Sequence, residues 1–124
     1  MQATDRAQRL KIDIRHAILD NVIALNRQRK AAIQAGNAGQ MNEIQESINA
    51  LQDCLEDLSF FSLETLEASP GLRQKITKLR GAADKLEDEA DNIKKVADAL
   101  TKAANIIDQA VNIVAKVKEL VPGV

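Results

Sequence analysis

Three features of the sequence predict an all-α fold: an antiparallel three-helix bundle with a long C-terminal helix of heptad pattern and coiled-coil-like packing. Aromatic residues make up only 2% of the 124 residues, whereas residues of high helix propensity dominate. Apolar residues recur at steps of three and four along most of the chain. Glycine and proline gather at 36–39 and 69–71, and these interruptions divide residues 1–124, a length typical of one domain, into three helical segments.

The first predicted helix covers about 4–35 and has a broad apolar face of helical period. That face is formed by Ala7, Leu10, Ile14, Ala17 or Ile18, Val22, Leu25 and Ala32. Seven basic and three acidic residues give this helix a charge of +4. Its cluster of Arg27, Arg29 and Lys30 lies where positive charge complements the helix dipole, and this structural role is favoured over nucleic-acid binding.

The second predicted helix covers about 41–68 and carries seven acidic residues and no basic residue, a charge of −7. Its apolar face consists of Ile44, Ile48, Leu51, Leu55 and Leu58. The short connections predict that it runs antiparallel to both other helices. The third helix has a charge of +2, so the acidic helix is expected to contact both basic neighbours. Alternatively, its acidic face docks a basic partner.

The solvent-facing stripe of the second helix leads to a phenylalanine. The stripe runs through Asn42, Glu46, Asn49, Asp53 and Glu56, and its next member is Phe60. Either Phe60 is exposed, where it would be a good anchor for a partner, or the helix bends around 59–62 so that Phe60 and Phe61 both pack. The bend is the favoured alternative.

The third predicted helix covers about 70–121 and begins with Ser69 as its N-cap and Pro70 in its first turn. Its apolar residues keep one heptad register: Leu72, Ile76, Leu79, Ala83, Leu86, Ala90, Ile93, Ala97, Leu100, Ala104, Ile107, Val111, Val114 and Val121. This register is typical of a left-handed coiled coil, although an ordinary long bundle helix has the same geometry. The helix is expected to continue through Gly81.

In a three-helix bundle, no other helix would pack against the last part of the third helix. At about 1.5 Å per residue the second helix spans roughly 40 Å and the third roughly 75 Å, so the hairpin covers the third helix only to about residue 98. The remainder is the segment richest in apolar residues, and burying one such side chain is worth about 1.5–3 kcal/mol. We therefore expect an antiparallel homodimer through 100–121, in preference to a break near 103–105 that folds the end back as a fourth helix. The expected partner-binding residues are Phe60, Ile106, Ile107, Val111, Ile113, Val114 and Val117.

The predicted core offers no polar group for chemistry, which argues against an enzyme and predicts no catalytic, cofactor or metal site. His16 has Asp13 and Asp20 one turn away, but one histidine is short of the three or four ligands of a zinc site, so a surface ion pair is expected. Cys54 is expected to behave as a small, half-buried hydrophobic residue. The glycines lie between helices, so no phosphate-binding loop is expected.

These features predict a non-enzymatic protein-interaction or assembly module that acts through helix packing, with a second copy or a helical protein as its partner. The alternatives are a small immunity or antitoxin-like inhibitor that presents the acidic helix, and a membrane-active helical protein that uses 100–121. The net charge of −1 argues against nucleic acid, and the lack of a basic polar face around 100–121 argues against a membrane partner. Without a signal sequence or a long apolar run, a cytoplasmic location is expected, and leaderless export stays open.

Overall fold

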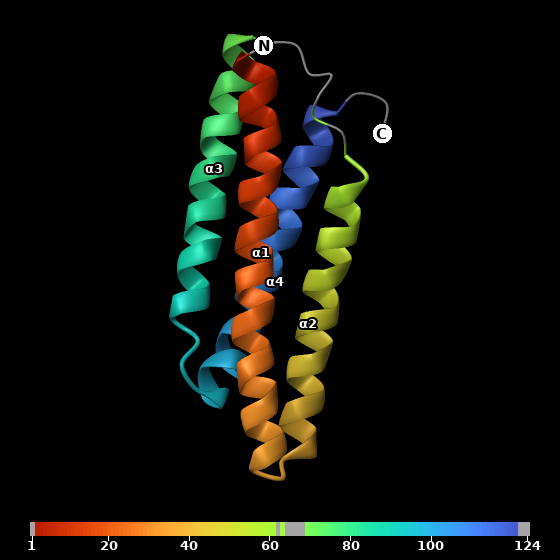
Figure 1. The fold of residues 1–124 in the computed structure, drawn as a ribbon, viewed down its shortest axis with the longest axis vertical. Coiled ribbons are helices and arrows are strands. Elements are labelled where there is room, and N and C mark those ends of the chain that lie inside the picture. The colour runs from red at the N-terminus through yellow and green to blue at the C-terminus, as the bar shows by residue number, and fades with distance from the viewer. Residues whose placement is uncertain (1, 62, 64–68, 122–124) are drawn as a thin grey trace.

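The computed structural model describes residues 2–61, 63 and 69–121, and within them the chain forms four α-helices and no strand. The helices are α1 (Gln2–Gln34), α2 (Ala38–Ser59), α3 (Pro70–Asp91) and α4 (Val96–Leu120). Consecutive helices run in opposite directions (Figure 1). The all-α prediction is confirmed, but the described part of the chain has four helices instead of three.

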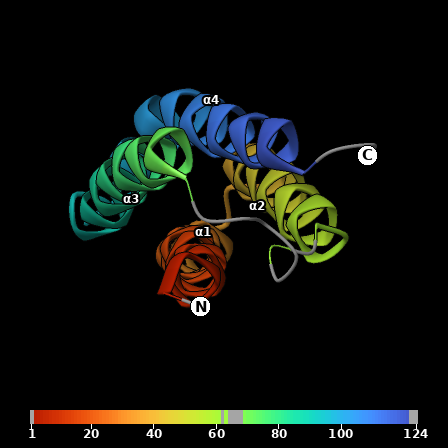
Figure 2. The ribbon, with the colours of Figure 1, turned by 90° about the horizontal axis from the view of Figure 1, so that it is seen from above.

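The four helices lie at the corners of a bundle, with α1 and α4 on one diagonal and α2 and α3 on the other (Figure 2). α1 packs against α2 and α3, and α4 packs against the same two helices. Within the described residues α2 and α3 do not contact each other, although they follow one another in the chain. The acidic helix therefore contacts both predicted neighbours, but it touches the predicted third helix only through α4, the part of 70–121 that folds back.

The core lies between all four helices and contains the apolar faces that the sequence pattern predicts for α1, α2 and α3. Its largest fully buried side chains include Leu10, Ile14, Ile18, Leu25, Ile44, Leu51, Leu58, Leu86, Ile106 and Val117. Burial of one such side chain is worth about 1.5–3 kcal/mol, so this core is the main force that holds the helices together. Asn21 is buried among them, and its side-chain amide donates to the carbonyl oxygens of Ala17 at 2.9 Å and Leu86 at 2.7 Å, which ties α1 to α3.

A glycine ends α1 as the sequence predicts. Gly36 has a φ of +74°, in the left-handed region that favours glycine. The N–H groups of Asn37 and Gly36 donate to the carbonyl oxygens of Ala32 at 2.9 Å and Ile33 at 3.0 Å, which is a Schellman motif. The Oδ1 atom of Asn37 then accepts from the N–H of Gln40 at 3.0 Å and caps α2. One tight turn therefore closes α1 and opens α2.

α2 ends at Ser59, well before the predicted end at 68. Phe61 and Leu63 follow outside any helix and are both buried in the core. An earlier end to α2 lets these two apolar side chains turn inward, and their burial outweighs the helical turns that are given up. The other residues of the predicted extension, 62 and 64–68, lie outside the described ones.

The predicted single helix over 70–121 is wrong, because the chain leaves helical geometry at residues 92–95 and folds back as α4. Lys95 is extended, with φ −151° and ψ 168°, and Oδ2 of Asp98 accepts from the N–H of Lys94 at 3.1 Å. Ile93 is buried between the two helices. The fold-back is the less favoured alternative of the sequence analysis, and it occurs about ten residues earlier than expected. It lets α4 bury its apolar side chains within the chain, which outweighs the few helical hydrogen bonds lost at the break.

The break also changes which face of α4 is buried. The buried residues are Ala99, Ala103, Ile106, Ala110, Ile113, Val114, Val117 and Leu120. Most of them lie one position before a residue of the predicted heptad register, such as Ile107 or Val111. One residue corresponds to a rotation of roughly 100° about the helix axis. The predicted seam therefore faces partly outward, and Val111 is 49% exposed.

Candidate interaction surfaces

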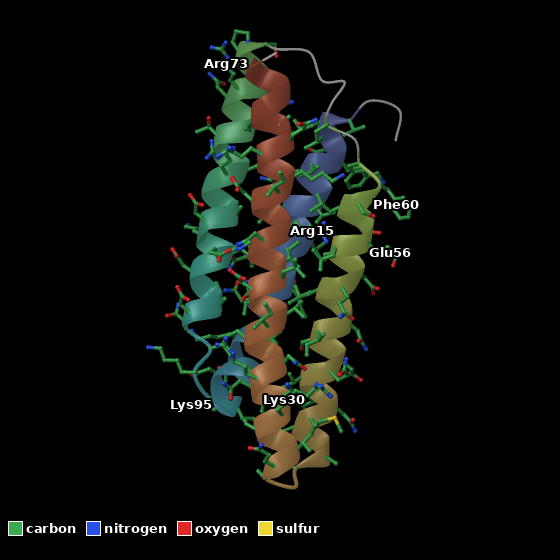
Figure 3. The ribbon with its side chains drawn as sticks, viewed as in Figure 1. Arg15, Lys30, Glu56, Phe60, Arg73 and Lys95 are labelled. Atoms are coloured by element: carbon green, nitrogen blue, oxygen red, sulfur yellow. The ribbon has the colours of Figure 1, made fainter. Side chains whose placement is uncertain are left out.

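The outer side of α2 forms an exposed, negatively charged face that ends in an aromatic side chain. We call it the acidic face of α2; its members are Glu43, Glu46, Asp53, Glu56, Asp57 and Phe60, and all are exposed. The side chain of Phe60 is 73% exposed, whereas that of Phe61 is buried. Figure 3 shows Glu56 and Phe60 pointing away from the bundle. The two phenylalanines are thus divided between the alternatives, with one ring packed and the other on the surface.

The carboxylates of the acidic face have no ion-pair partner among the described residues. The ion pairs found there join Asp20, Glu87 and Asp13 to bases of α1 and α3, and none involves α2. Asp53, Glu56 and Asp57 lie in the last two turns of α2, where the helix dipole already places negative charge. Helix stability therefore does not explain the position of these charges, and no described basic side chain forms an ion pair with the acidic face.

A small hollow adjoins the exposed phenylalanine. It has a volume of about 350 Å³ and lies between α1 and the end of α2, lined in part by Phe60 and Ile12. The side chain of Ile12 is 65% exposed. The Nζ atom of Lys11 donates to the carbonyl oxygen of Phe61 at 2.8 Å, which fixes the chain at the end of α2. Phe60 and Ile12 therefore offer apolar contact beside the acidic face.

A larger and oppositely charged groove lies between α3 and α4. Its volume is about 720 Å³, and we call it the basic groove. Its lysines are Lys75, Lys78, Lys85 and Lys116, and its apolar lining includes Leu79, Ile113 and Leu120. None of these lysines forms an ion pair with a described residue, although Asp88, Glu89 and Glu119 also line the groove.

Two lysines of the groove lie on the side of α3 where the helix dipole disfavours positive charge. Lys75 and Lys78 occupy the first half of α3, near its positive end. Sequence reasoning missed the groove because its two walls are far apart in the chain. They meet only because the break at 92–95 folds α4 back along α3.

A third cluster joins α1 to α3 through side chains of opposite charge. The Nδ1 atom of His16 lies 3.4 Å from Asp20 Oδ2 and 3.4 Å from Glu87 Oε2. Burial is the main cause that raises the pKa of Glu87 above its ordinary value, followed by the neighbouring Asp20 carboxylate, while His16 lowers it. Asp13, which sequence spacing placed beside His16, instead pairs with Arg80 at 3.7 Å.

The three side chains of His16, Asp20 and Glu87 are the described group that comes closest to a cation site, with ligand atoms within 4.8 Å of one another. One exposed imidazole and two carboxylates fall short of the closed set of nitrogen and sulfur ligands that holds structural zinc. We interpret the cluster as ion pairs that link two parallel helices. Glu87 had no sequence signal, since only the packing of α3 on α1 brings it near His16.

The partner-binding residues expected in 100–121 lie mostly inside the chain itself. Ile106, Ile113, Val114 and Val117 are buried in the core. Ile107 is half-buried, and Val111 is the most exposed of the set in α4. The apolar side chains of 100–121 therefore need no second copy to bury them, because α4 packs against α1, α2 and α3 of the same chain.

Cys54 is buried, and burial raises the pKa of its thiol, with further contributions from the carboxylates of Asp57 and Asp53. A thiol in this setting is a poor nucleophile at neutral pH. None of the helices in the described ranges is long and apolar enough to cross a membrane. Comparison of the chain with protein-family models, curated proteins and solved structures finds no match.

Proposed function

We propose that the chain is a non-enzymatic protein-interaction module that binds through the acidic face of α2, with Phe60 as its anchor. The observation that carries the proposal is the exposure of 73% of the Phe60 side chain next to uncompensated carboxylates. Burying a phenylalanine side chain is worth about 1.5–3 kcal/mol, so burial of this exposed ring against a partner would contribute a free energy of that size to binding. Aromatic anchors surrounded by polar residues are typical of binding hot spots.

The charges of α2 indicate the chemistry of the partner. The five carboxylates repel one another, and Asp53, Glu56 and Asp57 also oppose the helix dipole, so a surface rich in lysine or arginine would relieve both effects. Such charges act mainly by steering the partner and orienting it, because an exposed ion pair adds only about 0–1 kcal/mol. The anchor would therefore supply affinity and the carboxylates would supply selectivity.

The inhibitor hypothesis uses the same surface and differs only in the identity of the basic target. It is supported by the same acidic face, and the experiment below distinguishes it by the protein captured. The membrane hypothesis has less support, because the apolar residues of 100–121 pack in the core and α4 would have to leave the bundle to present them.

The experiment places a photo-crosslinking benzophenone side chain at position 60 in cells that express the protein. We expect crosslinked adducts at this position that disappear when Asp53 and Glu56 are changed to Lys. The same group at Gln34, an exposed position at the far end of α1, is the control. Adducts equal to those of the control, or adducts that ignore the charge reversal, would contradict the proposed binding face.

A further inference from the structure

Resting on this proposed function, we infer that the partner is a second copy of the chain, whose basic groove between α3 and α4 receives the acidic face of α2. The copies thereby assemble head to tail.

The first support is charge complementarity between two surfaces that each lack a partner. Five carboxylates and no base lie on α2, whereas four lysines and three acidic side chains line the groove, which leaves the groove with a small positive net charge. None of these groups forms an ion pair within its own chain among the described residues. The net charge of the whole chain is only −1, so copies approach without strong overall repulsion while their unlike faces attract.

The second support is the shape and lining of the groove. Its volume of about 720 Å³ lies in the range of sites that hold compact ligands, so an aromatic ring enters with room for neighbouring side chains. Leu79, Ile113 and Leu120, which are largely buried in the core, form the apolar floor of the groove on which the ring of Phe60 can lie. Lys78 and Lys116 lie on the two sides of this lining and can meet carboxylates that flank the ring. The groove thus combines the apolar contact and the positive charge that the acidic face needs.

The geometry of the bundle sets the form of the assembly. α2 lies on the corner opposite α3 (Figure 2), and Glu56 and Phe60 of the acidic face point away from the bundle (Figure 3), whereas the basic groove is lined by α3 and α4. When the acidic face of one copy binds the groove of another, the pair still has a free groove at one end and a free acidic face at the other. The assembly therefore grows head to tail into an open chain or a ring of several copies, unlike the antiparallel dimer that the sequence pattern suggests.

The test measures the mass of the purified full-length chain by light scattering at two salt concentrations. Charges act over roughly 30 Å at about 0.01 M salt but only over roughly 3 Å at about 1 M. At low salt we expect a mean mass that rises with protein concentration, and at high salt we expect it to fall toward the monomer mass of 13.5 kDa. A mass of 13.5 kDa at every concentration and salt level would overturn the inference.

Two charge-reversed variants make the test specific. One carries Asp53→Lys and Glu56→Lys on the acidic face, and the other carries Lys78→Glu and Lys116→Glu in the groove. Each variant alone should associate at least about tenfold more weakly than the original chain, because attraction becomes repulsion at two positions. An equal mixture should associate again, since the lysines at positions 53 and 56 of one variant now meet the glutamates at positions 78 and 116 of the other.

A matched control reverses Lys94 and Lys95 to Glu, two exposed lysines outside the groove, and should associate like the original chain. Circular dichroism confirms that each variant keeps its helices. A mixture of folded variants that stays monomeric overturns the inference. If the purified chain is monomeric while position 60 still crosslinks to other proteins in a charge-dependent way, the proposed function stands and the second copy is excluded as its partner.

Discussion

Two neighbouring isoleucines in α4 report directly on the break at residues 92–95. Ile106 is 0% exposed and Ile107 is only half-buried, because the break rotates the helix away from the continuous heptad register. Changing a fully buried isoleucine to alanine costs about 2–5 kcal/mol from lost burial and the cavity left behind. We therefore expect Ile106→Ala to reduce the free energy of unfolding by about 3 kcal/mol and Ile107→Ala by about 1 kcal/mol.

Urea unfolding followed by circular dichroism measures both variants under the same conditions. With a denaturant slope of about 1–3 kcal/mol/M for a small protein, Ile106→Ala should lower the midpoint by roughly 1–3 M and Ile107→Ala by much less. The pair differs only by one position, so helix propensity and chemistry are matched. A loss at Ile107 equal to or larger than the loss at Ile106 would restore the uninterrupted helix over 70–121 and refute the fold-back.

Four further predictions test other parts of the structure. The helix continues through Gly81 as expected, and a Cβ there would meet nothing within 4 Å, so Gly81→Ala should raise the free energy of unfolding by up to about 1 kcal/mol in thermal melts. Gly36→Ala should lower it by about 1–2 kcal/mol, because only Gly36 has a positive φ among the described residues. Because the fold raises the pKa of Glu87, the ionised carboxylate opposes folding as pH rises above its ordinary value of 4.5. Glu87→Gln should therefore raise the melting temperature at neutral pH and lose this advantage well below pH 4.5, whereas Asp88→Asn, at an exposed neighbour, serves as the control. Cys54 should react with a thiol reagent far more slowly in the native chain than in urea, since burial restricts access and raises the pKa of the thiol; equal rates would show that the end of α2 is open.

Local sequence signals were sufficient where a helix face or a turn depends on nearby residues. The period of the apolar residues in α1 and α2 identified their buried faces, and Gly36 and Ser69 marked helix ends correctly. The break at 92–95 could not be found in this way, because no glycine or proline marks it and the heptad register continues across it. It is decided by the burial of α4 against three other helices, which is a property of the whole fold.

The candidate surfaces also differ in how far the sequence alone could predict them. Helical period alone predicts the solvent-facing stripe of α2 that leads to Phe60. The exposure of the Phe60 ring was one of the two alternatives for this residue. The basic groove depends on α3 and α4 lying side by side, so Lys78 and Lys116 become neighbours only through tertiary structure. The same holds for His16 and Glu87, whose ion pair requires α1 and α3 to run parallel and in contact.

The most direct test of the account is a two-dimensional ¹H–¹⁵N NMR spectrum of the chain followed on dilution at low salt. If the acidic face of one copy meets the basic groove of the next, dilution should shift the amide signals of residues 53–60 on α2. It should also shift those of Lys78, Ile113 and Lys116 around the groove, and salt should have the same effect as dilution. Spectra that do not change on dilution, or changes confined to α1 around the exposed Ile23 and Ile33, would contradict this assembly.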